Sequence, residues 1–158
     1  MEVELEDQKR ACLVYVAETA AGVEAVKTRL EQNGFAVCAV EAKLEDALAA
    51  QNGETNLPEA LAECIDGSDL CVFLLPESEA NDGGLGQACG LASQLGKRII
   101  GIVAGTRENY PEPFEDNAES MIRQESDRLT DAICGTEVWE RPDRSPVADR
   151  PIKHVRCQ

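Results

Sequence analysis

Three polar segments of the sequence contain the residues that could do chemistry. Tyr15 ends an apolar run and is followed closely by residues 18–22 (Glu-Thr-Ala-Ala-Gly). Residues 76–82 are rich in carboxylates and lead into residues 83–87 (Gly-Gly-Leu-Gly-Gln). Glycines at a helix start permit close backbone approach, and the free N–H groups there attract anions or polar ligand atoms. Asp82 stands where its carboxylate could cap that helix, bind a ligand, or do both. These residue types favour recognition of a small polar molecule.

The glycine pattern matches no standard phosphate-binding motif. No Gly-Lys-Ser/Thr follows, which excludes a Walker loop, and the pattern follows the third predicted strand rather than the first, which excludes the dinucleotide fingerprint. The one histidine, His154, stands near the end of the chain, so a histidine-based triad or metal cage within the domain is not expected. We predict no metal site and no cofactor.

The seven cysteines show no C-x-x-C spacing, which argues against a zinc or redox motif. Cys12, Cys38 and Cys71 fall in apolar runs, where thiols act as small hydrophobic side chains. Free thiols are therefore expected throughout the chain, as is usual in the cytosol.

Length and charge narrow the class of protein. With 158 residues, 43% of them hydrophobic, we expect one domain over residues 1–141 and a charged, proline-rich tail over 142–158. A net charge of −15 repels phosphate backbones, so nucleic acid is not an expected partner. The start is acidic and no run of 18 apolar residues occurs, so neither a signal peptide nor a membrane span is expected. A soluble cytoplasmic protein follows.

Apolar runs and helical spacing alternate along the chain. The runs predict strands at 11–17, 35–40, 70–75 and 98–104, with an edge strand at 136–140. The spacing predicts helices at 20–33, 42–51, 57–65, 85–95 and 115–134. Continuous apolar strands that alternate with helices are typical of a parallel sheet covered on both faces. We therefore predict a flavodoxin-like α/β three-layer sandwich with a five-stranded parallel sheet of order 2-1-3-4-5.

In sheets of this kind, ligands bind beyond the carboxyl ends of the strands, near the point where the winding reverses. That rule places the loops after Ala17 and Leu75 side by side. The three polar segments are then expected to surround one hollow.

Three stretches resemble the nucleoside 2-deoxyribosyltransferase family. They are residues 68–75 (Ser-Asp-Leu-Cys-Val-Phe-Leu-Leu), 82–92 (Asp-Gly-Gly-Leu-Gly-Gln-Ala-Cys-Gly-Leu-Ala) and 96–100 (Gly-Lys-Arg-Ile-Ile). The family has an aspartate-initiated strand, an Asp-x-Gly turn, a helix with Glu-x-Gly-x-Ala and a Gly-Lys-Pro-like lead into the next strand. Tyr15 matches the tyrosine of the family's first strand. The resemblance covers about residues 11–104, and TIR-like domains that act on NAD share the layout more distantly.

The resemblance implies a ligand site for a nucleoside or nucleotide. The residues expected to line it are Tyr15, Thr19, Asp82, Gly84, Gly86, Gln87 and Ala88. Members of the family assemble into oligomers, so the resemblance also implies a homo-oligomer, with the 115–134 helix and the tail as the expected surfaces.

One departure from the family pattern concerns the nucleophile. The family's helix glutamate attacks the anomeric carbon, and that position corresponds to Ala88, which cannot attack. Two hypotheses follow: a binding domain that lacks the covalent chemistry, or an N-glycosidic hydrolase or transferase that uses a relocated carboxylate. Glu18, Glu77 and Glu79 are the candidates for that carboxylate. A third hypothesis is a TIR-like interaction module.

Overall fold

The computed structural model describes residues 9–42, 59–77, 82–105, 110, 112–124, 126, 128–136 and 138–139. The predicted helix at 42–51 falls on undescribed residues apart from Ala42, and the tail at 142–158 lies wholly outside the described residues. The strands are β1 Lys9–Tyr15, β2 Phe35–Glu41, β3 Leu70–Leu75, β4 Arg98–Val103 and β5 Ser120–Arg123. The helices are η2 Ala17–Gly22, α1 Val23–Gln32, α3 Glu59–Asp66, α4 Asp82–Gln94, α5 Glu112–Asn117 and α6 Leu129–Cys134. Within the described residues, every helix is too short or too polar to cross a bilayer.

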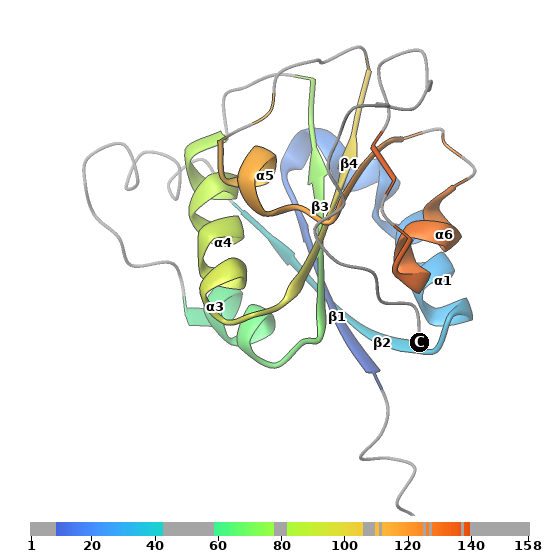
Figure 1. The fold of residues 1–158 in the computed structure, drawn as a ribbon, viewed down its shortest axis with the longest axis horizontal. Coiled ribbons are helices and arrows are strands. Elements are labelled where there is room, and N and C mark those ends of the chain that lie inside the picture. The colour runs from blue at the N-terminus through green and yellow to red at the C-terminus, as the bar shows by residue number, and fades with distance from the viewer. Residues whose placement is uncertain are drawn as a thin grey trace, which may run out of the picture.

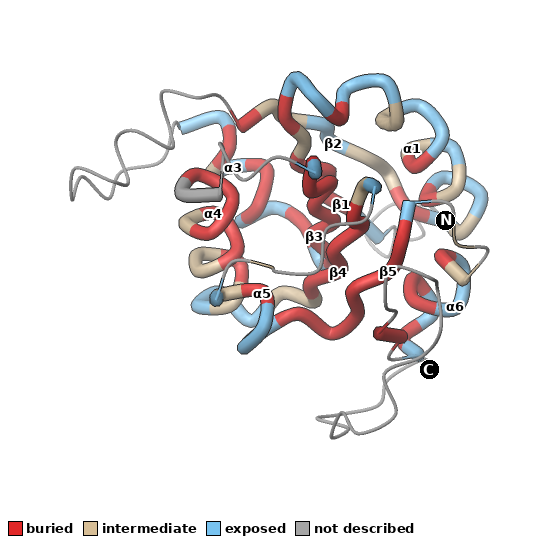
Figure 2. The backbone as a smooth tube through the Cα atoms, turned by 90° about the horizontal axis from the view of Figure 1, so that it is seen from above, coloured by how far each residue is buried: buried red, intermediate tan, exposed pale blue. Residues whose placement is uncertain are grey.

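The strands form one parallel sheet of order β2-β1-β3-β4-β5, which confirms the predicted flavodoxin-like α/β fold. All six residues of β3 are buried, as expected for a central strand covered on both faces. β2 lies at the edge and contains exposed residues, so the tube drawn in Figure 2 changes from buried to exposed towards that edge.

Helices cover both faces of the sheet (Figure 1). The α4 face is covered by α3, α4 and α5, and the α1 face by α1 and α6. Because strand side chains alternate, Cys12 and Val14 enter the core on the α4 face, whereas Ala11 and Leu13 enter the core on the α1 face. This alternation decides which predicted site residues share a face.

The predicted helix at 115–134 is wrong, and so is the edge strand at 136–140. The fifth strand is β5, and Trp139 adds to it only an isolated bridge with Met121. Met121 and Ile122 enter opposite cores, as neighbours on a strand must. The side chain of Met121 occupies the space beside Gly101, its register partner on β4, so a Cβ at that position would collide with it. The helix on which an oligomer surface was expected is therefore not formed, and the oligomer itself stays a prediction.

Three smaller expectations also need correction. The predicted helix at 20–33 begins as the 3-10 helix η2, and α4 starts three residues earlier than its predicted start at residue 85. Among the described cysteines, Cys12, Cys38, Cys64, Cys71 and Cys89 are free, but Cys134 is disulfide-bonded. Cys134 is exposed at the last residue of α6, where a thiol is accessible for pairing.

Two glycines provide a matched test of backbone conformation. Gly34 follows α1 with φ of 92°, which strains any side chain, whereas Gly90 lies within α4 and a Cβ there would meet nothing within 4 Å. The open space beside Gly90 accommodates a methyl group without moving a neighbour. We expect Gly34→Ala to lower the free energy of unfolding by about 1 kcal/mol and Gly90→Ala to raise it by about 0.5–1 kcal/mol. Urea unfolding of both variants measures this, and equal effects would contradict the assignment.

Candidate functional site

A cavity of about 160 Å³ lies at the carboxyl ends of β3 and β4, on the α1 face of the sheet. Its walls are mainly aliphatic, and a threonine hydroxyl and a glutamine amide are the side-chain hydrogen-bonding groups of the lining. The lining residues are Thr19, Gly22, Ala25, Val26, Leu74, Leu75, Ile102, Ala104 and Gln124. The cavity is therefore at the edge of the sheet where the fold predicts a ligand.

Thr19 fixes the segment after β1 against the end of β3. Its buried hydroxyl accepts a hydrogen bond from the Val16 N–H at 3.0 Å. The same hydroxyl is placed to donate to the Val16 carbonyl at 3.1 Å or the Leu74 carbonyl at 3.4 Å. Thr19 thus joins the segment after β1 to the end of β3 and positions the cavity wall.

Gln124 also lines the cavity, and sequence reasoning missed it. It follows β5, and its backbone N–H donates to the Val103 carbonyl at 2.9 Å. Its side-chain Nε2 would lie 3.4 Å from a Cβ on Gly22, so the amide reaches from β5 to the start of α1. It was missed because the sequence predicts one long helix over residues 115–134, and nothing in that prediction places this residue near the segment after the first strand.

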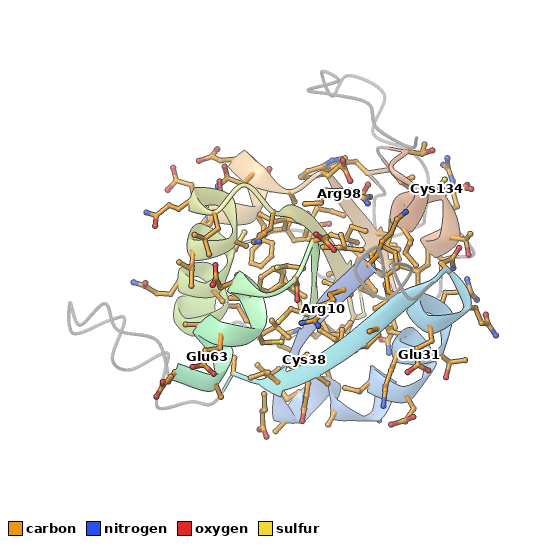
Figure 3. The ribbon with its side chains drawn as sticks, turned by 90° about the horizontal axis from the view of Figure 1, so that it is seen from below. Arg10, Glu31, Cys38, Glu63, Arg98 and Cys134 are labelled. Carbon is orange, nitrogen blue, oxygen red and sulfur yellow. The ribbon has the colours of Figure 1, made fainter. Side chains whose placement is uncertain are left out.

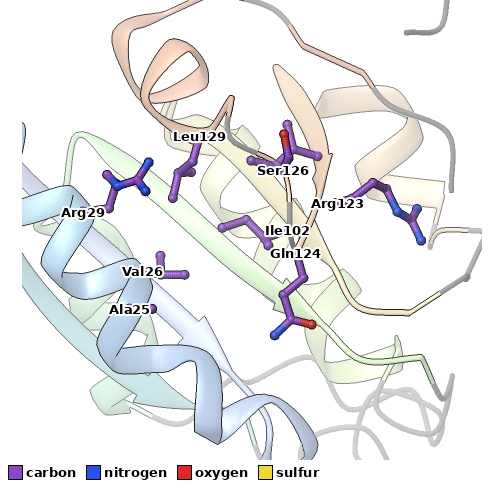
Figure 4. A pocket seen from close by; sticks show the side chains of 9 residues that line it. Ala25, Val26, Arg29, Ile102, Arg123, Gln124, Ser126 and Leu129 are labelled. Atoms are coloured by element: carbon purple, nitrogen blue, oxygen red, sulfur yellow. The ribbon is translucent and has the colours of Figure 1, made fainter. Parts of the chain in front are cut away.

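The cavity continues into a groove between α1 and the chain that runs from β5 to α6. A second hollow of about 110 Å³ shares Ala25, Val26, Ile102 and Gln124 with the first. Figure 4 shows Arg29 and Leu129 towards one end of this groove and Gln124 towards the other. The Arg29 guanidinium donates to the Thr130 hydroxyl at 3.3 Å, which holds a cation beside the groove.

A polar cluster borders the cavity at the ends of β4 and β5. Arg123 is 1% exposed, and its guanidinium donates to the Gly105 carbonyl at 2.7 Å and the Tyr110 hydroxyl at 3.1 Å. In Figure 4 this guanidinium points away from the groove. The carboxyl group of Glu77 occupies the space that a Cβ on Gly105 would need. Glu77 therefore contacts the residue that follows Ala104, which lines the cavity.

The residues predicted from α4 lie on the other face of the sheet. Ala88 is fully buried in the core of the α4 face, Gly84 and Gly86 are buried, and Gln87 is half-buried. Tyr15 is half-buried and packs against the core of the α1 face. The structure therefore brings Tyr15 and Thr19 to one face and Ala88 to the other, rather than around one hollow.

The remaining predicted residues are exposed, or their side chains lie outside the described part of the structure. Glu18 is exposed in the first turn of η2. Asp82 is the first residue of α4, but its side chain is outside the described part of the structure, as is Glu79. The ligand roles assigned to these residues remain predictions.

The class of protein that the fold defines is the flavodoxin-like α/β class, and comparisons with known proteins add little to it. No protein-family model matches the chain, and no curated protein sequence matches it. The chain is similar to a solved fusion of a segment of the yeast Spc42 trimeric coiled coil with another structure. The identity is 14%, the TM-score is 0.42, and the match covers 79% of this chain and 74% of that chain. A similarity this weak carries no argument about function.

Proposed function

We propose that the protein binds a nucleoside or nucleotide in the groove on the α1 face. The observation that carries the proposal is the aliphatic cavity at the carboxyl ends of β3 and β4, with the Gln124 amide on its wall. A cavity of about 150 Å³ is large enough to hold a benzene ring, so a volume of about 160 Å³ suits one planar ring. An amide offers both a donor and an acceptor, which matches the edge of a nucleobase.

The groove determines the direction in which the sugar and phosphate of such a ligand would extend. With the base beside Leu74 and Ile102, the sugar and any phosphate extend along the groove towards Ser126 and Arg29. A guanidinium is well suited to a phosphate, and this cation stands out against the net charge of −15. The proposal therefore favours a nucleotide over a nucleoside at low ionic strength.

An enzyme that cleaves an N-glycosidic bond is the second candidate, and Glu77 is the observation that favours it. Its carboxyl group contacts Gly105 beside the cavity, whereas the position that matches the family nucleophile is the buried Ala88. A reacting carboxylate must come within about 3 Å of the sugar carbon. Glu77 would therefore have to turn towards the cavity when a ligand binds.

A panel of nucleosides and nucleotides tests the two candidates together. A ligand at 100-fold excess over its dissociation constant is expected to stabilise the full chain by about 2.7 kcal/mol, which appears as a rise in melting temperature. Chromatography of the same mixtures detects released base. A melting shift without base release supports binding alone, and base release that Glu77→Gln abolishes supports the enzyme. No shift with any member of the panel contradicts the proposal.

Blocking the groove tests where the ligand binds. Ala25 lines both hollows and is exposed on α1, so Ala25→Leu is tolerated by the helix and places a larger side chain in the groove. We expect affinity for the nucleotide identified by the panel to fall at least about tenfold, which corresponds to 1.4 kcal/mol. Isothermal titration measures this. Ala21→Leu, at an exposed position of η2 outside both hollows, is the matched control and should bind like the parent. Equal affinities for the two variants would place the ligand elsewhere.

A further inference from the structure

Four cysteines from four elements meet on the α4 face of the sheet. Cys38, Cys12 and Cys71 occupy matching register positions on β2, β1 and β3, so their side chains form a row on one face. Cys64 of α3 packs over this row. Its thiol donates to the Cys38 carbonyl at 3.2 Å and lies within hydrogen-bonding reach of the Cys12 and Cys38 thiols. We refer to these four residues as the thiol cluster.

The thiol cluster is not arranged as a metal site. Within the described residues, no group of three or more His, Cys, Asp or Glu side chains is placed to hold an ion. The cluster therefore suits chemistry between sulfur atoms, for which two thiols in contact are sufficient.

The four thiols differ in how readily they ionise. Burial raises the pKa of Cys71 to about 12 and that of Cys38 to about 11. The hydrogen bond between Cys12 and Cys64 raises the pKa of Cys12 and lowers the pKa of Cys64, the latter against the effect of burial. Because the thiolate is the reactive form, Cys64 is the member of the cluster best prepared to attack.

A cavity of about 270 Å³ gives access to this thiol. It lies between the first halves of β1 and β2 and the end of α3, away from the groove on the α1 face. Its lining includes Cys38, Cys64, Arg10, Glu63, Gly67 and Ser68. Figure 3 shows Arg10, Cys38 and Glu63 on the neighbouring elements that border it. Cys38 is exposed, and Cys64 is 7% exposed.

We propose that Cys64 and Cys38 form a peroxide-sensitive dithiol that closes a reversible disulfide between α3 and β2. The Cys64 thiolate attacks a hydroperoxide in the cavity, so that an S–O bond forms, the O–O bond breaks and the leaving alkoxide or hydroxide takes a proton. The Cys38 sulfur then attacks the sulfenic sulfur of Cys64 while its thiol proton passes to the departing hydroxyl group, so that the S–S bond forms, the S–O bond breaks and water leaves. The two sulfur atoms together lose two electrons, which reduce the peroxide to an alcohol or water. Because α3 packs against β2, the disulfide ties the edge strand to the helix.

Peptide mapping of the full chain tests this proposal independently of any nucleotide. The reduced protein is treated with hydrogen peroxide, alkylated, digested and analysed by mass spectrometry. We expect a Cys38–Cys64 linkage that dithiothreitol reverses, both in the parent and in Cys89→Ser, which removes a buried thiol outside this cavity. In Cys38→Ser, Cys64 should stop at the sulfenic acid, which dimedone traps.

Two outcomes would overturn the proposal. One is a Cys64 that stays reduced while the exposed Cys38 oxidises, which would mean that the cavity admits no oxidant. The other is a Cys64 linkage to Cys12 in place of Cys38. Cys64→Ser keeps a hydroxyl donor for the Cys38 carbonyl, and its melting curve shows whether a missing linkage reflects misfolding.

Discussion

Replacing Ala88 with glutamate is expected to lower the free energy of unfolding by about 3 kcal/mol or more. The side chain of Ala88 is fully buried in the core of the α4 face, beside Leu85 and Cys89. Glutamate adds four heavy atoms, three of which form a carboxylate, to a site that is fully buried among apolar side chains. Urea unfolding at neutral pH measures the loss. The same substitution places a glutamate at the position that matches the nucleophile of the resembled family. It therefore also tests whether a glutamate there gives the activity of that family or only disrupts the core.

Gln87→Glu is the control for this experiment. Gln87 is half-buried next to Ala88, so a carboxylate there can reach water and should cost about 1 kcal/mol or less. An Ala88→Glu variant that stays as stable as the parent and releases base from nucleosides would contradict this account, because it would return the catalytic site to the α4 face.

Replacing Arg98 with methionine is expected to destabilise the protein by about 3–5 kcal/mol. The Arg98 guanidinium pairs with Glu119 at 2.9 Å and donates to the carbonyls of Ala132 and Ile133 at 3.0 Å each. One side chain thus joins the start of β4, the residue before β5 and the last turn of α6. The side chain of Glu119 is only 2% exposed, so methionine leaves its carboxylate buried and without this cation. Chemical unfolding gives the magnitude.

Glu119→Gln separates the charge from the connections of the arginine. The amide of this variant still accepts a hydrogen bond from Arg98. The arginine side chain, which is 25% exposed, also keeps its contacts with α6. We expect this variant to lose less stability than Arg98→Met. A larger loss in Glu119→Gln, or a neutral Arg98→Met, would show that the ion pair does not anchor β5.

The order of the strands could be predicted from the sequence because the central strands are long and continuously apolar. Residues 70–75 are buried on both faces, and runs of this kind indicate a covered parallel sheet. The fifth strand could not be found in this way. β5 has four residues, too few to show alternation, and charged residues on either side favour a helical interpretation. Its place became visible only through its pairing with β4.

The candidate site was predicted less well than the fold, for a related reason. The sequence placed polar loops at the edge of the sheet where the cavity lies, and Thr19 lines that cavity. It did not separate the two faces: Tyr15 packs on the α1 face, whereas Ala88 packs on the α4 face. Gln124 was missed together with β5. The thiol cluster depends on strand register and helix packing, which cysteine spacing alone does not contain.

The most direct test of whether the α1-face groove is the binding site is an NMR titration. In it, the full chain is titrated with the nucleotide that the panel identifies. We expect amide shifts confined to the residues that border the groove, with Thr19, Ile102 and Gln124 among the largest. Residues 84–92 of α4, on the opposite face, should shift little. Large changes along α4 with an unperturbed Gln124 would contradict the central claim.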